Sequence, residues 1–528
     1  MTDTDQTTPA AGSDAATGTA ATGTAATGSA AAAQEPIALR PDTLGEIAAR
    51  GVAVPTYDRE GLTAGIVHFG VGGFHRAHQA MVVDRLLAAG EARDLAICGV
   101  GVLEQDRRMK EVMDAQGGLY TLVLKHPDGR REARVIGSIV EYLLAVDDAE
   151  AVIEKMASPE TRIVSLTVTE GGYNFHHVTG EFDESTPAVR ADVEAVAAGR
   201  LPHTTFGLVA AALQRRRERG VEPFTVMSCD NIPGNGHVAK KMFSAYADLV
   251  DPDLATWMRE SVSFPNCMVD RITPVTSDDD RAEVRDVLGV DDAWPVVAEP
   301  FFQWVLEDDF PLGRPPYEQA DVQLVDDVEP YEFMKLRLLN ASHQGLCYFG
   351  YLSGYRYAHE ATADPAIATF LRSYMDREAT PTLPPVPGID LDDYKATLIE
   401  RFRNPEVRDT LARLCAESSD RIPKWLLPVV RENLASGGEV ARSAAIVASW
   451  ARYAEGTDEH GEPITVVDRL AERLTATALT QRDDRLAFLR DRELFGDLAD
   501  EPRFTEPYLD ALAGLVDDGA HATVTRLQ

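Results

Sequence analysis

The chain has 528 residues, of which 45% are hydrophobic and 26% charged, the composition of an ordinary soluble globular protein with room for two or more domains. Its formal net charge is −34, whereas nucleic acids and anionic membranes bind proteins with basic surfaces, so we expect neither as a partner. No uncharged apolar run is long enough to span a bilayer, and five scattered cysteines without a C-x-x-C pair indicate reduced thiols in a cytoplasmic protein.

Three segments of different composition predict the domain organisation. Residues 1–34 are an Ala/Thr/Gly repeat of low complexity, without the basic start and apolar stretch of a secretory signal, and we expect them to be disordered. Residues 35–320 carry the pattern of a nucleotide-binding α/β domain, and residues 321–528 that of a mainly α-helical catalytic domain. We expect the protein to be a monomer or a small homo-oligomer.

The predicted elements of the first domain alternate between strands and helices. Short apolar runs predict strands at residues 64–70, 94–101, 162–172 and 224–231, while helical spacing fits residues 75–90 and 204–220. Strands that are continuously apolar and alternate with helices are typical of a parallel sheet covered on both faces. The fold class that we predict is therefore α/β, with a doubly wound Rossmann-type sheet followed by a helical domain.

A glycine turn follows the first predicted strand. The stretch GVGGFHR at residues 70–76 leads from that strand into a helix, which is where a dinucleotide pyrophosphate approaches the backbone in Rossmann domains. The full G-x-G-x-x-G fingerprint is incomplete, because His75 stands at the third glycine position. An ordinary tight turn remains the alternative interpretation.

An acidic cluster follows the second predicted strand. Rossmann domains use a carboxylate near this point to bind the adenosine ribose hydroxyls, and Glu104 and Asp106 stand there. An acid at this position favours NAD over NADP. Arg107 and Arg108 come directly after it, so the preference for NAD stays open at this point.

Three polar residues interrupt a predicted helix of the second domain. In KLRLLNASH, Lys335, Asn340 and His343 fall within an arc of about 140° on an α-helix, so they can point at one site. A buried lysine has a lowered pKa and can exchange a proton with an alcohol, and asparagine amides can stabilise charge on the reacting oxygen. A snorkelling lysine and a hydrogen-bonded core histidine are the alternatives.

The sequence resembles the polyol-specific long-chain dehydrogenase family, to which mannitol dehydrogenases belong. The family pattern of Lys, four residues, Asn, two residues and His is matched by Lys335, Asn340 and His343. Further agreement extends from about residue 40 to the end, in the segments 66–80, 97–101, 162–173, 224–236, 263–274, 291–308 and 385–395. The resemblance implies a metal-independent enzyme that uses NAD to interconvert a polyol and a ketose. D-mannitol and D-fructose are the pair that we expect.

The resemblance also implies a set of site residues. Lys335 would be the general acid–base, while Asn231 and Asn340 would bind the reacting oxygen. The remaining implied residues are Asp270 beside the reacting centre, Glu170 on a proton path, His343, Arg413 and Arg421 at the substrate, and Gly70, Gly72, Gly73, Phe74, Arg76 and Asp106 at the cofactor.

This sequence departs from the family pattern at several positions. Gln105 takes the place of one of two acids after the second strand, Arg421 replaces a lysine near the substrate, and Ala341 replaces a glycine beside Asn340. The change from lysine to arginine keeps the charge but changes its geometry.

Several alternatives remain open at the level of sequence. Taken alone, Asn231 is also explained as a turn residue, Asp270 as one half of an ion pair with Arg271, and Arg413 as a surface charge. Within the same family, a fructuronate or tagaturonate reductase or an arabinitol dehydrogenase is an alternative. A catalytically silent NAD-binding sensor is the alternative from another functional class.

Overall fold

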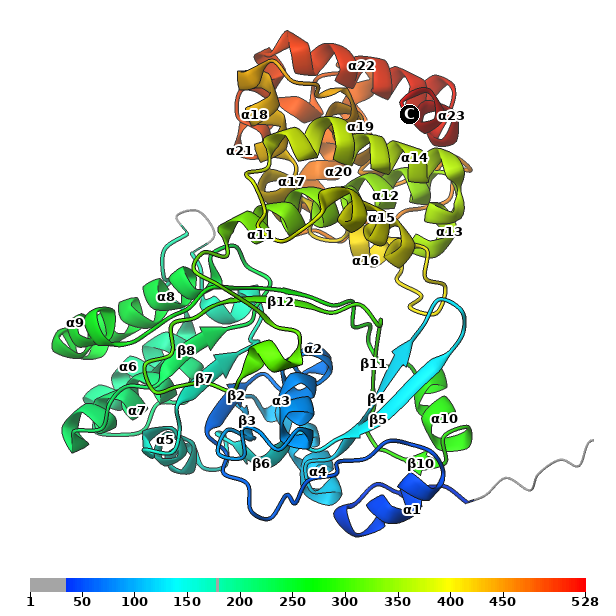
Figure 1. Cartoon of the computed structure of the whole chain (residues 1–528). Helices are drawn as coiled ribbons and strands as arrows, with labels where there is room; N and C mark the ends of the chain where they lie inside the picture. The colour runs from blue at the N-terminus through cyan, green and yellow to red at the C-terminus, as the bar shows by residue number, and fades with distance from the viewer. Residues whose placement is uncertain (1–34, 177–179) are drawn as a thin grey trace, which may run out of the picture. The chain divides into compact units, whose positions relative to one another are not determined.

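The computed structural model describes residues 35–176 and 180–528, and residues 36–528 form one compact unit. The predicted disordered tail at residues 1–34 lies outside the described residues. Figure 1 shows a parallel sheet flanked by helices in the first part of this unit and a separate gathering of helices in the second part. The predicted fold class, a Rossmann-type sheet followed by a helical domain, is confirmed.

A five-stranded, all-parallel sheet organises the first part. Its order is β6-β3-β2-β7-β8, with bounds β2 Ile66–Phe69, β3 Ile97–Gly101, β6 Ile139–Leu144, β7 Ile163–Leu166 and β8 Thr225–Ser228. Numbered within the sheet alone, this is the order 3-2-1-4-5 of dinucleotide-binding domains. The order of the strands reverses between β2 and β7, so the carboxyl ends of these two strands mark the expected ligand crevice.

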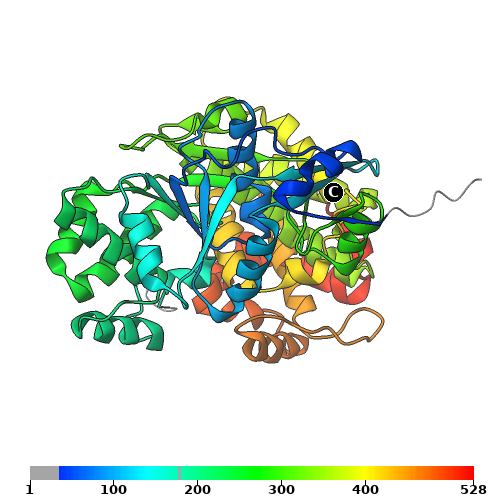
Figure 2. The same ribbon diagram turned by 90° about the horizontal axis from the view of Figure 1, so that it is seen from below.

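Helices cover both faces of the sheet, as Figure 2 shows from below. Along β2, Ile66 packs against α3 Gln79–Ala88 and α4 Arg107–Gln116, whereas Val67 packs in a second core. That second core includes side chains of α5 Ala149–Ala157, α7 Thr205–Arg219 and α8 Asn235–Val250. The alternation explains why the strands are apolar on both faces and lack an alternating polar pattern.

The structure corrects the sequence prediction in three places. The strand β6, with the mixed sequence IVEYLL, was not predicted, and neither was the antiparallel hairpin of β4 Tyr120–Lys125 and β5 Arg131–Ile136. The predicted helix over residues 75–90 is interrupted at His78, whose backbone is not helical, so that α2 Gly73–Ala77 and α3 are separate helices. Charged residues in β5 and β6 concealed these two strands, and the residues around His78 continue the helical spacing across the break.

Smaller sheets and outer helices complete the first part. The strand β9 Cys267–Asp270 pairs with β12 Gln303–Glu307, which pairs in turn with β13 Gln323–Val325. The remaining elements are β1 Ile37–Ala38, β10 Val290–Asp291, β11 Val296–Ala298, α1 Leu44–Ala49, α6 Pro187–Ala197, α9 Pro252–Ser261 and α10 Asp278–Asp286.

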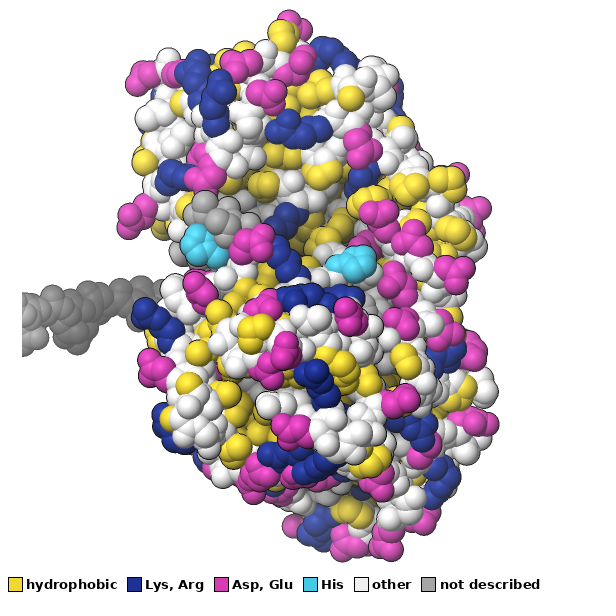
Figure 3. Space-filling view, turned by 90° about the vertical axis from the view of Figure 1, so that its left-hand side faces the viewer, with side chains coloured by type: hydrophobic (Ala, Val, Ile, Leu, Met, Phe, Trp, Pro, Cys, Tyr) yellow, Lys and Arg dark blue, Asp and Glu magenta, His cyan; other side chains and the backbone are white. Residues whose placement is uncertain are grey.

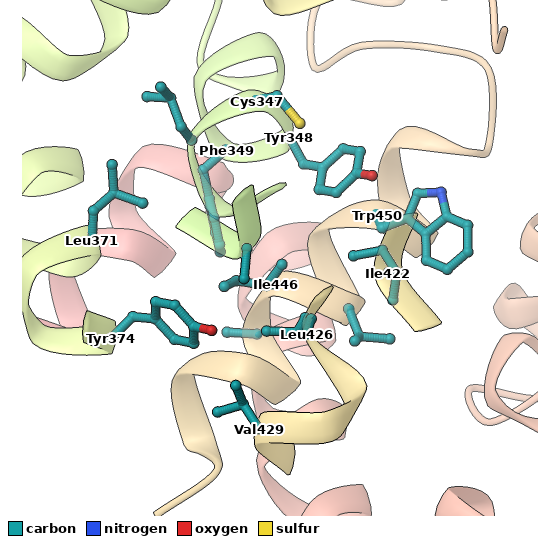
Figure 4. Close-up of a cluster of buried hydrophobic side chains, with 14 of the residues drawn as sticks. Cys347, Tyr348, Phe349, Leu371, Tyr374, Ile422, Leu426, Val429, Ile446 and Trp450 are labelled. Atoms are coloured by element: carbon teal, nitrogen blue, oxygen red, sulfur yellow. The ribbon is translucent and has the colours of Figure 1, made fainter. Parts of the chain in front are cut away.

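The second part is helical around the buried helix α12 Ala341–Leu352. Its other α-helices are α11 Glu329–Met334, α13 Ala358–Ala363, α14 Pro365–Tyr374, α15 Leu391–Phe402, α16 Leu411–Cys415, α17 Ser418–Trp425, α18 Leu427–Ser436, α19 Ala441–Tyr453, α20 Ala471–Leu479, α21 Arg492–Phe495, α22 Pro502–Asp517 and α23 Ala520–Arg526. Figure 4 shows Tyr348 and Phe349 of α12 among Ile446 and Trp450 of α19. Each such buried side chain contributes about 1.5–3 kcal/mol, which fixes α12 as a rigid support.

Candidate active site

A π-helical turn carries the lysine of the predicted motif. Residues Lys335–Asn340 form this turn between α11 and α12, and the N–H of Ala341 donates to the carbonyl of Leu336, five residues earlier. This wider turn brings residues five apart onto one face, which favours a shared orientation of Lys335 and Asn340. Single π-turns inside helices occur frequently at functional sites.

The Lys335 ammonium group is buried in a polar cage. Its Nζ donates to the carbonyl oxygen of Val269 at 2.6 Å and to Oδ1 of Asn231, which lies in the loop after β8. Only 7% of Lys335 is exposed. Burial lowers the pKa of this lysine below its ordinary value, and the nearby Asp270 carboxylate opposes the shift only in part.

A small pocket opens beside this lysine. Its walls include Lys335, Asn231, Asp230, Glu332 and Cys267. Burial raises the pKa of Glu332 to about 7, although the N–H of Gly234 donates to its carboxylate. Burial also raises the pKa of Asp230 to about 6, against three hydrogen bonds that stabilise its charge. Groups whose protonation changes near neutral pH thus surround the lysine.

A buried ion-pair cluster lies behind the lysine. Arg401 donates to both carboxylate oxygens of Asp270, at 2.7 and 2.9 Å, and to both of Glu299, at 3.0 and 2.7 Å. Burial alone would raise the pKa of Asp270, but the Arg401 guanidinium outweighs burial and lowers it. The alternative ion pair of Asp270 with Arg271 is wrong, because Arg271 donates to backbone carbonyls, among them that of Glu299.

The predicted histidine lines a second small pocket. His343 lines it together with Arg401 and Asp409, and its ring packs against Phe402 with the ring centres 4.5 Å apart. Burial lowers the pKa of His343 to about 3, so its imidazole is neutral. Asn340 is buried, and within the described part of the chain its Nδ2 has no hydrogen-bond acceptor.

Of three further predicted site residues, Arg413 and Glu170 are exposed and Arg421 is half-buried. The side chain of Arg413 is 58% exposed and forms an ion pair with Asp409 at 2.5 Å. Arg421 donates to the carbonyls of Arg413 and Leu414, which fixes it at the end of α16. Glu170 is exposed in the turn after β7 and pairs with Lys424 of α17.

The glycine turn has the conformation that its sequence predicts. Gly70 has a φ of +90°, and a Cβ there would come within 2.2 Å of the carbonyl oxygen of Thr167, so only glycine fits. Around Gly72, a Cβ would meet nothing closer than 3.8 Å, which leaves its outer side open to a ligand. Gly73 begins α2, and Phe74 follows it, stacked on His78.

Two other residues predicted at the cofactor are engaged by the protein. Arg76 is almost fully buried, where its guanidinium donates to the carbonyl of Trp294 and lies over the ring of Tyr120. The carboxylate of Asp106 accepts the backbone N–H groups of Val102 and Leu103, which shapes the turn after β3. For Arg76 and Asp106, the visible contacts are therefore structural.

The structure thus brings together part of the predicted set. Lys335, Asn231 and the Asp270 cluster meet at the ends of β8 and β9, and Arg401 connects this cluster to His343. The sequence prediction missed Glu332, Glu299 and Arg401, and it considered Asp230 only as a turn residue that bonds the backbone. Glu332, three residues before Lys335, was the one with a local signal, since it shares a helical face with the lysine.

Two properties of the described residues complete the site. Within residues 35–176 and 180–528, no group of three or more His, Cys, Asp and Glu residues is arranged to hold a metal ion. In the same ranges, no helix has the length and apolar character needed to cross a bilayer. The face drawn in Figure 3 has a hollow near its middle, where Lys and Arg side chains lie beside apolar ones.

Comparison with protein families places both parts of the chain in one family. A family model described as the mannitol dehydrogenase Rossmann domain matches residues 64–319, and a model of the mannitol dehydrogenase C-terminal domain matches residues 327–516. Mannitol 2-dehydrogenase from Phaeosphaeria nodorum is 45% identical over 496 residues, which cover 93% of this chain and 86% of that protein. The Aspergillus fumigatus mannitol 2-dehydrogenase is 44% identical, with 93% and 99% covered.

Solved structures agree with these relatives. The ternary complex of Pseudomonas fluorescens mannitol 2-dehydrogenase with NAD and D-mannitol is 45% identical and superposes with a TM-score of 0.83, covering 93% of this chain and 99% of that one. A substrate-free D-sorbitol dehydrogenase is 38% identical with a TM-score of 0.84, covering 92% and 100%. The resemblance noted from the sequence motifs is confirmed.

Proposed function

Because the chain belongs to the mannitol dehydrogenase family, we propose that it oxidises D-mannitol at C2 to D-fructose with NAD and catalyses the reverse reduction with NADH. The observation that carries this proposal is the buried Lys335 amine, held by two acceptors at the edge of a pocket. Mannitol 2-dehydrogenases at 44–45% identity support the choice of substrate.

The hydrogen bonds of Lys335 suit a group that exchanges a proton with the substrate. A neutral amine has two N–H groups, and Val269 and Asn231 accept both, so the nitrogen lone pair is left to take the hydroxyl proton of the polyol. In the reduction, the ammonium form has a third N–H, which donates to the ketose carbonyl. We propose this lysine as the general acid–base, without a metal ion.

The asparagines complete the stabilisation of the reacting oxygen. Because Oδ1 of Asn231 is bound to Lys335, its Nδ2 group remains to donate to the oxygen on which negative charge develops. Nδ2 of Asn340 lacks an acceptor among the described residues and supplies a second donor. We propose that Asp270, beside the lysine, helps to place the cofactor and the catalytic groups, and that Glu170 lies on a path that connects the lysine to solvent.

The glycine turn fits a dinucleotide. Gly70, Gly72 and Gly73 lie at the reversal of strand order, and the open side of Gly72 lets a pyrophosphate approach the backbone. When bound, NAD supplies the acceptor for the hydride that leaves the polyol. Arg107 is paired with Glu104 and Asp147, which supports a preference for NAD. Arg108 is exposed and lies over the ring of Trp294, so the comparison of NADH with NADPH below tests this preference.

The charges near the second pocket favour a neutral polyol over a uronate. A uronate carboxylate needs a cation, whereas Arg413 already faces Asp409, Arg401 faces two carboxylates and His343 is neutral. Arg421 is the cation that would suit a uronate, and its guanidinium already donates to the carbonyls of Arg413 and Leu414. We propose that His343 and Arg413 contact hydroxyl groups of the polyol and that Arg421 supports them from the end of α16. Residues 35–320 and 321–528 are the proposed domains of a cytoplasmic monomer or small homo-oligomer.

Substrate kinetics test the proposed reaction. Purified protein is assayed with NADH or NADPH at 340 nm against D-fructose, fructuronate and tagaturonate, and in the opposite direction against D-mannitol, D-sorbitol and arabinitol. We expect D-fructose and D-mannitol with NAD(H) to give the highest kcat/KM. Turnover of uronates alone would exclude the proposed substrate, and NADH binding without any turnover would identify a sensor instead of an enzyme.

A Lys335→Met variant tests the role of the lysine. We expect kcat to fall by about 10²–10⁴-fold, the range typical of a lost general acid–base, while NADH binding measured by fluorescence is retained. Near-normal turnover in this variant would exclude the lysine from the proton transfer.

A further inference from the structure

The turn after β7 contains a strained residue. Thr169 has φ and ψ of 65° and 168°, a combination that is almost restricted to glycine. Threonine is β-branched, so this conformation is costly unless the surrounding structure imposes it. The turn follows β7, one of the two strands between which the strand order reverses, and therefore borders the expected dinucleotide crevice.

The carboxylate of Asp230 holds this turn. Its Oδ1 accepts the N–H of Thr169 at 2.8 Å, and its Oδ2 accepts the N–H of Val168 at 3.1 Å and the hydroxyl of Tyr173 at 2.8 Å. Asp230 is buried, and Tyr173 is fully buried and also bonded to Ser228. Three hydrogen bonds to a buried charge are strong enough to maintain the strained backbone.

Asp230 is also joined to the catalytic side of the pocket. It directly precedes Asn231, whose Oδ1 accepts a hydrogen bond from Lys335. Its backbone carbonyl accepts the N–H of Ile232 at 2.9 Å and Nδ2 of Asn235 at 3.0 Å, so its main chain is fixed as well. The same residue thus connects the β7 turn with the asparagine beside the lysine.

We propose that Asp230 is a positioning residue that keeps the strained Val168–Thr169 turn in register with Asn231 and Lys335. This inference rests on the proposed function, since it assigns a role within the same reaction. Asp230 touches neither the reacting oxygen nor the hydride in this assignment. Asp230 fixes the distance between the cofactor side of the crevice and the Lys335 amine. Loss of its carboxylate should therefore slow the chemical step and leave the binding of substrate and NADH nearly unchanged.

An Asp230→Asn variant tests the clamp. The amide has nearly the same shape but only one accepting oxygen, so it cannot accept from both N–H groups and the hydroxyl. We expect kcat for D-fructose reduction to fall about 10- to 100-fold, as for the loss of hydrogen bonds to a charged group, with KM and the NADH dissociation constant within about threefold of the wild type. Hydrogen exchange of the amides of Val168 and Thr169 should become faster.

Asp192 provides a matched control. It is buried and accepts two backbone N–H groups, of His203 and Thr204, and the hydroxyl of Thr204, in the same pattern but outside the site. Asp192→Asn should lower the thermal stability while kcat and exchange in the β7 turn stay unchanged. An equal loss of kcat in both variants would overturn the positioning role, because a general loss of stability would then explain it.

Relief of the strain provides a rescue test. Glycine adopts the Thr169 conformation without strain, so adding Thr169→Gly to Asp230→Asn should restore kcat at least about fivefold. If Asp230→Asn does not fold, Tyr173→Phe removes one of the three donors, and we expect a smaller fall in kcat with faster exchange in the turn.

Unchanged kcat in the Asp230 variant, or unchanged exchange in the turn, would overturn the inference. Should the wild type reduce no ketose, the proposed function fails, and the exchange measurement still decides whether Asp230 holds the turn.

Discussion

Removal of Arg401 should destabilise the folded protein strongly. This guanidinium lies between Asp270 and Glu299, whose side chains are 7% and 2% exposed, and makes two hydrogen bonds to each. In Arg401→Met, the buried carboxylates of Asp270 and Glu299 lose the guanidinium that pairs with both of them. Breaking a buried ion pair by removal of one partner costs about 3–5 kcal/mol, and we expect a loss of stability in this range at about pH 8.

The loss should depend on pH in a defined direction. Without the guanidinium, burial and mutual repulsion raise the carboxylate pKa in the folded variant above its value in the unfolded chain. The folded variant then binds one more proton than the unfolded chain, so its stability improves as the pH falls toward about 5, by about 1.4 kcal/mol per pH unit over that range. In the wild type, Arg401 holds the pKa of Asp270 low. The difference in the free energy of unfolding between the wild type and Arg401→Met should therefore become smaller as the pH falls.

Urea unfolding followed by circular dichroism at several pH values measures both effects. Arg314 supplies the matched control, because it also pairs with two carboxylates, those of Asp308 and Glu318, but these are 50% and 54% exposed. Arg314→Met should change the free energy of unfolding by less than about 1 kcal/mol. A similarly small change in Arg401→Met, or a difference that does not depend on pH, would refute the reasoning.

The remaining predictions concern the pocket around Lys335. Since burial lowers the pKa of this lysine, kcat/KM for polyol oxidation should rise with pH until the amine is neutral, and ketose reduction should fall over the same range; parallel profiles would contradict the assignment. Asn231→Ala should lower kcat by about 10²–10³-fold in steady-state assays with little change in NADH binding, and a change in KM alone would argue against it. Glu332, with its pKa raised to about 7, holds its proton more tightly in the folded state, so the wild type loses stability as the pH rises from about 5 to about 7. Glu332→Gln lacks this titration. Its free energy of unfolding, measured with urea, should rise relative to the wild type by up to about 3 kcal/mol over that pH range. If the free energies of both proteins depend on pH in the same way, the pKa of Glu332 is not raised.

Much of the fold follows from local patterns in the sequence. The four predicted strands of the sheet are recognised as short apolar runs. The glycine turn is recognised because a positive φ is needed where a strand leads directly into a helix. The strand β6 could not be predicted in this way, because Glu141 interrupts its apolar pattern and its pairing with β3 is a contact between distant residues. The hairpin of β4 and β5 is instead a local contact whose loop contains Asp128 and Gly129, a recognisable hairpin signal, so the sequence did carry the information to predict it.

The site is less local than the fold. Lys335 and His343 were found because they share one helix, whereas Arg401 lies about sixty residues further on, in an ordinary amphipathic helix that gives no sign of its two buried partners. The contacts of Asp106 and Arg76 were equally invisible, since a carboxylate that binds backbone N–H groups and one that binds a ribose look alike in sequence.

The π-turn suits the proposed role of Lys335 as a proton carrier. In a regular α-helix Lys335 and Asn340 would lie about 140° apart, whereas the wider turn brings them closer to one direction, and the buried helix α12 holds the turn in place. Burial lowers the pKa of the amine, and Asp270 would restore it if its charge were free. Arg401 neutralises much of that charge. In the proposed mechanism, the reactivity of the lysine depends on a guanidinium that does not touch it, and Arg401→Met should shift the pH profile of polyol oxidation to higher pH as well as destabilise the protein.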